Sequence, residues 1–316
     1  MTSSRRLHTS EALDIVDHTG RIRTNLLKRY LPGTMDAIRF YHFTGTLARL
    51  PVVGRFVKKG LHLYYRYLHT NSLVFPLKEM EAVIETATDL YVDPCPCRVI
   101  AEDNRCDAPI YTCMRINHTA ALRKEMKGEA GLSKGDALAI LRNAYEKGLV
   151  LSLESCIQPY QNNICMCCTC CCIAMKMRYD YGVPIYNSGP YLPVWGGEAC
   201  TDCSSCAAAC PVGALSITGG GVWVDLDTCL GCGHCAAVCP SGAIEMVLSP
   251  SRVRKEPEPG PIRLILSLVY IHAVMVPSVL LFRLVAGSRQ DLMDHAFPND
   301  NDFFEPSMQP LKRGDS

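Results

Sequence analysis

Apolar and polar positions in the middle of the chain follow a helical period and then the alternation of a strand, twice in succession. The first occurrence predicts a helix over residues 77–88 that leads into a strand at 90–92. The second predicts a helix that begins at the capping residue Ser133 and is followed by a strand at 150–154. Each unit delivers a group of cysteines at the end of its strand. The pattern therefore predicts a cysteine-rich α/β module over residues 77–194.

A nearly uninterrupted apolar run extends from Leu264 to Phe282. As a helix it would be roughly 28 Å long, close to the ~30 Å of a bilayer core. Its apolar residues surround the helix axis instead of forming one stripe, which favours lipid or a deep protein interface. Pro277 predicts a kink within it. The sequence leaves three placements open: a membrane span, a seat at the membrane surface, or docking into a partner subunit.

Charge is distributed unevenly, although the formal net charge is only +1. Residues 1–76 hold 12 Lys and Arg against 4 Asp and Glu, whereas residues 77–250 hold 12 against 19. Aromatic and basic residues interleave over residues 40–68, a composition that suits an anionic membrane surface or an ordinary basic docking surface. Because the cysteine-rich body is acidic, we expect no nucleic-acid partner.

Shifts in composition divide the chain into six parts. They are a basic helical arm (1–76), the cysteine-rich α/β module (77–194), a domain with a cysteine repeat (195–248), a proline-rich linker (249–261), an apolar helix (262–286) and a polar tail (287–316). The expected fold class is α+β, with helical flanks at both ends. No nucleotide-binding or nucleophile-elbow motif is present, so no catalytic residue is assigned.

The chain has 19 cysteines, an odd number that complete disulfide pairing cannot satisfy. Its first ten residues are polar and basic, without the apolar stretch of a secretory signal. We therefore expect a cytoplasmic protein whose thiols stay reduced and bind metal, with attachment to the cytoplasmic face of the inner membrane left open.

Eight cysteines form an internal repeat with an offset of 29 residues, each copy reading C-x2-C-x2-C-x3-C-P. In this motif three cysteines wrap one iron–sulfur cluster, and the fourth reaches the other cluster. The predicted ligand sets are Cys200, Cys203, Cys206 with Cys239, and Cys229, Cys232, Cys235 with Cys210. Two zinc sites are the alternative for such spacing.

Residues 198–247 resemble bacterial-type two-[4Fe-4S] ferredoxin domains. The resemblance implies a small α+β domain with pseudo-twofold symmetry that holds two clusters close together. Its strands are expected at residues 214–218, 222–225 and 244–248. The part of the chain that precedes this domain resembles, loosely, the N-terminal halves of multicluster iron–sulfur proteins that end in a ferredoxin domain, a resemblance that implies no particular function.

The other 11 cysteines lie between residues 95 and 172. Read as a helix, residues 165–172 place their cysteines on two faces. We interpret this set as holding one or two further [4Fe-4S] clusters, with zinc or a redox dithiol as alternatives. The candidate ligands are Cys95, Cys97, Cys106, Cys113, Cys165, Cys167, Cys168, Cys170 and Cys171, whereas Cys156 and Cys172 are left unassigned.

These features favour an electron-transfer protein with three or four clusters, acting as a subunit of a larger oxidoreductase that is cytoplasmic or membrane-attached and linked to quinone. Its expected partners are the other subunits or redox proteins. One alternative is a reductase with a catalytic cluster in residues 95–172, fed by the ferredoxin domain. Another is an iron–sulfur redox sensor that acts through a partner.

Overall fold

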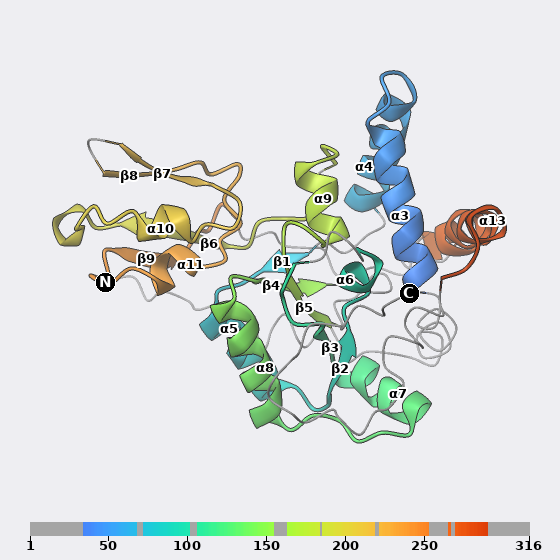
Figure 1. Cartoon of the computed structure of the whole chain (residues 1–316), viewed down its shortest axis with the longest axis horizontal. Helices are drawn as coiled ribbons and strands as arrows, with labels where there is room; N and C mark the ends of the chain where they lie inside the picture. The colour runs from blue at the N-terminus through green and yellow to red at the C-terminus, as the bar shows by residue number, and fades with distance from the viewer. Residues whose placement is uncertain are drawn as a thin grey trace, which may run out of the picture.

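The computed structural model shows an α+β protein arranged along one long axis (Figure 1). A five-stranded sheet lies in the middle, a small domain that contains the cysteine repeat lies at one end, and a group of helices lies at the other. The structure describes residues 34–67, 72–101, 106–154, 163–183, 185–218, 221–252, 265–266 and 269–289.

The central sheet has the strand order β1-β4-β5-β3-β2, and every neighbouring pair is antiparallel. Its strands are β1 (Leu73–Val74), β2 (Leu90–Pro94), β3 (Tyr111–Ile116), β4 (Val150–Glu154) and β5 (Asn163–Cys167). The prediction of an α/β module is therefore wrong, because such a module has parallel strands joined by helical crossovers. Here β2 pairs with β3, and β4 with β5, as antiparallel partners that are consecutive in the chain.

The sheet separates an apolar core from a face rich in cysteine. Ile164 and Met166 of β5 belong to the main core, together with α5 (Leu77–Thr86) and α8 (Lys134–Glu146). Because side chains alternate along a strand, Cys165 and Cys167 lie on the opposite face. The shorter helices of the module are α6 (Pro96–Ile100), α7 (Asn117–Lys127) and α9 (Ile173–Tyr179).

Local sequence signals placed four elements of the module correctly, namely α5, β2, α8 and β4. The helix predicted at 77–88 is α5, and the strand predicted at 90–92 lies within β2. The Ser133 side chain caps α8 by accepting a hydrogen bond of 3.1 Å from the backbone N–H of Asp136. The strand at 150–154 is β4.

The helical interpretation of residues 165–172 is wrong. Residues up to Cys167 form β5, which pairs with β3 on one side and β4 on the other, and α9 begins only at Ile173. Hydrogen bonds to two neighbouring strands outweigh the local helical pattern of the cysteines. The cysteines from 168 to 172 consequently lie in a turn, not on the faces of a helix.

The repeat domain consists of two antiparallel strand pairs and two single-turn helices. The strand β6 (Tyr191–Trp195) pairs with β9 (Ile244–Leu248), and β7 (Leu215–Thr218) with β8 (Gly221–Val224). The helices α10 (Ser205–Ala208) and α11 (His234–Ala237) follow the cysteine loops, and a 3-10 turn spans Gly197–Ala199. The three predicted strands correspond to β7, β8 and β9, whereas β6 was not predicted. The backbone N–H of Ser249 donates to the Pro190 carbonyl at 2.8 Å, so the chain enters and leaves the domain at one place.

The helical flank consists of α3 (Thr34–Ala48), α4 (Val53–Tyr67) and α13 (Val276–Ala286). The Phe282 ring lies 5.9 Å from that of Phe40 and 5.5 Å from that of Phe43, which holds α13 against α3. A π-helical turn, Ile271–Met275, precedes α13, and Pro277 lies in the first turn that follows. Among the described residues, no helix has both the length and the apolar character needed to cross a bilayer.

Candidate metal centres

Two hollows in the repeat domain are each lined by four cysteines. The outer hollow is lined by Cys200, Cys203, Cys206 and Cys239, and the inner hollow by Cys210, Cys229, Cys232 and Cys235. Each hollow therefore combines three thiols of one repeat copy with the last thiol of the other. This is the crossed grouping that the spacing predicts, and four thiols around each hollow match the donor set of a [4Fe-4S] cluster.

The backbone around these cysteines is shaped to face a negatively charged group. Asp202 and Ser204 in the first copy have φ angles of 54° and 60°, and Gly231 and Gly233 in the second have 76° and 84°. Alternation of right- and left-handed residues turns backbone N–H groups inward to form a nest, which is common at iron–sulfur sites. Further backbone N–H groups donate to the crossing thiols at 3.2 Å, from Ala214 to Cys210 and from Ala243 to Cys239.

The inner hollow is more deeply enclosed than the outer one. Cys229, Cys232 and Cys235 are buried, whereas Cys203 in the outer hollow is exposed. Burial raises the pKa of Cys232 and that of Cys235 to about 12. These thiols therefore give up their protons only when a cation takes their place, as thiolate ligands do.

Residues 199–243 match the family model of the 4Fe-4S dicluster domain. This segment is a 4Fe-4S dicluster domain. The match covers the whole cysteine repeat and leaves the rest of the chain outside it. No curated protein matches the chain.

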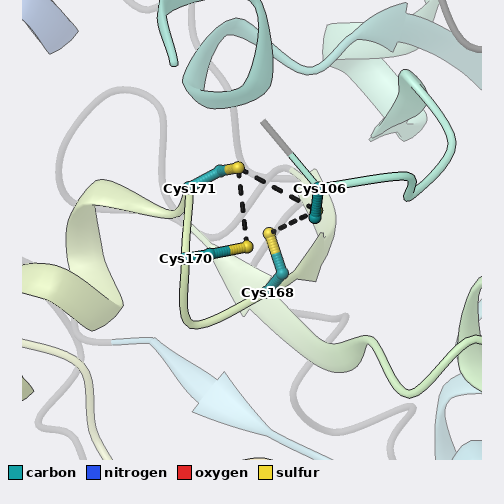
Figure 2. A group of neighbouring side chains, drawn as sticks. All are labelled: Cys106, Cys168, Cys170 and Cys171. Atoms are coloured by element: carbon teal, nitrogen blue, oxygen red, sulfur yellow. Dashed lines mark hydrogen bonds between the residues drawn. The ribbon is translucent and has the colours of Figure 1, made fainter. Parts of the chain in front are cut away.

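Outside the dicluster domain, four thiols converge on one centre, which we call the four-thiol site (Figure 2). Its members are Cys106, Cys168, Cys170 and Cys171, whose sulfur atoms all lie within 4.8 Å of one another. The Sγ–Sγ distances are 3.5 Å between Cys106 and Cys168, 3.9 Å between Cys106 and Cys171, and 3.6 Å between Cys170 and Cys171. Cys106 precedes β3, and the other three belong to the turn after β5.

Six other thiols form a second group on the cysteine face of the sheet, which we call the six-thiol row. Its members are Cys95, Cys97, Cys172, Cys167, Cys165 and Cys113, in the order in which neighbours interact. The thiols of Cys172 and Cys95 raise the pKa of Cys97, and those of Cys113 and Cys167 raise the pKa of Cys165. The described cysteines between residues 95 and 172 thus form two centres, the four-thiol site and the six-thiol row, whose members are interleaved along the chain.

Arg98 is a fully buried cation between the two centres. Its guanidinium group donates to the Pro109 and Met166 carbonyls, each at 2.8 Å, and to the Cys168 sulfur at 3.7 Å. Burial opposes this charge, but the thiolates of Cys95 and Cys168 outweigh it and keep the pKa of Arg98 above its ordinary value. The neighbouring Cys171 thiol lowers the pKa of Cys168 to about 4; burial opposes this shift and Arg98 supports it.

Sequence reasoning missed two features of these centres. It left Cys172 unassigned, although the structure places this residue in the six-thiol row. A strand pattern that ends at Cys167 was the signal that could have grouped Cys172 with the thiols of the row. It gave no role to Arg98, whose only signal is its place beside the Cys95–Cys97 pair. Cys156, also unassigned, lies outside the described residues.

The inner hollow is packed directly against the module. Cys232 and Leu230 belong to one buried cluster with Cys167 and Cys172 of the six-thiol row. The Tyr145 hydroxyl of α8 donates to the Cys232 carbonyl at 3.3 Å, and its ring stacks on His234 at 4.1 Å.

Proposed function

We propose that the protein relays electrons singly along three [4Fe-4S] clusters, two in the dicluster domain and one on the six-thiol row, as a subunit of a larger oxidoreductase. One observation carries the proposal: thiols of the inner hollow and of the six-thiol row share a single packed cluster of buried side chains. When bound, the clusters supply one-electron exchange at potentials set by burial and by hydrogen bonds to sulfur.

The chain encloses the inner hollow and leaves the outer hollow accessible to solvent and to a partner. Buried Leu230, Tyr186 and Met175 belong to the same cluster as Cys232 and the thiols of the row, so this contact is shielded from water. At the outer hollow, exposed Cys203 offers a place where an external donor or acceptor can approach. Electrons would therefore pass between a docked partner and the interior of the module.

Iron and acid-labile sulfide on the anaerobically purified chain test the relay, together with EPR of the dithionite-reduced protein. We expect about 12 iron atoms per chain and spin-coupled signals. About 8 iron atoms would confine the clusters to the dicluster domain and would contradict a relay into the module.

A pair of variants tests the order of the relay. Cys210→Ser should damage the cluster held with Cys229, Cys232 and Cys235, and should abolish coupling to the six-thiol row. Cys239→Ser, the matched control at the equivalent position of the other repeat copy, should remove the outer cluster and preserve the coupling between the inner hollow and the six-thiol row. Equal loss of that coupling in both variants would contradict the proposed order.

The reductase alternative predicts a different response to small molecules. A catalytic cluster in residues 95–172 needs an open iron site, so candidate substrates should change the EPR spectrum of the reduced protein. For a relay we expect spectra that do not respond to substrates and reoxidation only by a redox partner. A substrate-dependent spectrum would favour the reductase.

We further propose that the helical flank rests on an anionic membrane surface, which would bring the relay near membrane quinones. On α4, Phe56 is 74% exposed beside the exposed basic residues Arg55 and Lys59. On α13, Leu284 and Val285 are 83% and 81% exposed. Apolar side chains flanked by basic ones are the composition of helices that lie in the headgroup region.

Flotation with lipid vesicles tests this proposed association of the helical flank with the membrane. We expect the chain to float with vesicles that contain phosphatidylserine and to stay behind with neutral phosphatidylcholine vesicles. Phe56→Glu should weaken binding several-fold, whereas Trp223→Glu, at a 62% exposed residue of the dicluster domain, should leave it unchanged. Binding that is equal for both lipids, or for both variants, would contradict the proposal.

A further inference from the structure

We propose that the four-thiol site binds a single zinc ion, held tetrahedrally by Cys106, Cys168, Cys170 and Cys171, and not an iron–sulfur cluster. The inference concerns the spacing of the sulfur atoms and is independent of whether the six-thiol row holds a cluster. It also changes the metal content expected of the chain, because one of the two centres between residues 95 and 172 then carries zinc and no iron.

The sulfur spacing matches one ion. A tetrahedral zinc site has metal–sulfur bonds of about 2.3 Å, so its sulfur atoms stand about 3.8 Å apart. The distances of 3.5, 3.6 and 3.9 Å in the four-thiol site are close to this value, and no pair exceeds 4.8 Å. In a [4Fe-4S] cluster each thiolate binds a different iron atom, so the four thiolates must surround the whole cluster.

The dicluster domain provides the comparison within the same molecule. Its eight cysteines are all described, and in neither hollow do three sulfur atoms lie within 4.8 Å of one another. In the part of the chain that the structure describes, four thiols thus surround an open space in two places and draw together in one. The contrast separates sites built for a cluster from a site built for one ion.

The surroundings of the four-thiol site fit a closed structural centre. Four thiolates complete the coordination of zinc and leave no position for a substrate, as in structural zinc sites with four cysteine ligands. Four thiolates and Zn²⁺ carry a net charge of −2, and Arg98 offsets part of it by donating to Cys168 at 3.7 Å. The ion would join the segment before β3 to the turn after β5.

Zinc X-ray absorption on the wild-type chain, purified without oxygen and with its clusters intact, is the first test. We expect close to one zinc per chain and a single shell of four sulfur atoms at about 2.3 Å, without a metal–metal shell. Absence of zinc, a shell of nitrogen or oxygen atoms, or one iron in a tetrathiolate site would overturn the proposal. This measurement needs no variant and so does not depend on how a substituted chain folds.

Two alanine variants at exposed cysteines provide the second test. Cys170→Ala should lose the zinc and keep the iron and sulfide of the wild type. Cys203→Ala, which also removes an exposed thiol, should lose about four iron atoms and keep the zinc. Loss of about four iron atoms in Cys170→Ala would assign a cluster to the four-thiol site and overturn the proposal.

Discussion

At the scale of the residue, the two cysteine loops of the dicluster domain have similar backbone conformations but different residues at equivalent positions. Where the first copy has Asp202 at a φ of 54°, the second has Gly231 at 76°. The difference has a steric reason, since a Cβ atom on Gly231 would lie 2.3 Å from the Tyr191 carbonyl oxygen. Glycine at this position thus allows the loop of the inner hollow to approach β6.

Gly231→Ala should therefore lower the free energy of unfolding more than the replacement of another glycine with positive φ by alanine. A left-handed alanine costs about 1–2 kcal/mol, and the clash with Tyr191 adds about 1–3 kcal/mol. Gly213→Ala is the matched control, because Gly213 has a φ of 65° and nothing lies within 4 Å of its Cβ position. Anaerobic denaturant unfolding, with iron content measured beside it, should show the larger loss for Gly231→Ala, and equal losses would contradict the steric account.

At the scale of the element, the strand β5 explains both what the sequence could predict and what it could not. Ser133 and the strand at 150–154 were predictable because their signals are local. The strand character of residues 163–167 depends on pairing with β3 and β4, which a pattern of cysteines does not reveal. The grouping of thiols is equally non-local, because Cys106 meets Cys168 although the two are 62 positions apart in the chain.

Arg98 provides a test of how β5 is held, because its side chain joins α6 to the end of this strand. Arg98→Met removes the guanidinium donor from the Met166 and Pro109 carbonyls and the buried cation from beside the thiolates. The expected loss is about 3–5 kcal/mol of unfolding free energy, the usual cost of breaking a buried charged network. It should appear as a lower midpoint of anaerobic unfolding.

The matched control for this change is Arg142→Met. Arg142 makes an ion pair of 2.6 Å with Glu81, and its side chain is 54% exposed. Removing an exposed pair should cost no more than about 1 kcal/mol. A loss for Arg98→Met as small as that for the control would mean that the buried guanidinium has no net role in stability.

At the scale of the whole molecule, the centres and surfaces are ordered along the long axis. The dicluster domain lies at one end, the five-stranded sheet follows, and α13 with α3 and α4 lies at the other end (Figure 1). The buried cluster that contains Cys232 and Cys167 joins the first two of these regions. A partner at the outer hollow and a membrane under the helical flank would therefore occupy opposite ends and not compete.

The hydrogen bond between Ser249 and Pro190 gives the domain a property that its metal chemistry does not require. Because its two ends meet, the dicluster domain is attached to the protein as a long loop is attached to a scaffold. Segments with adjacent ends tolerate insertion and circular permutation, since neither rearranges the surrounding core. In evolutionary terms, such a domain can be inserted as one segment without changing the strand order of the five-stranded sheet, whereas the buried cluster around Cys232 and Cys167 has to adapt on both sides.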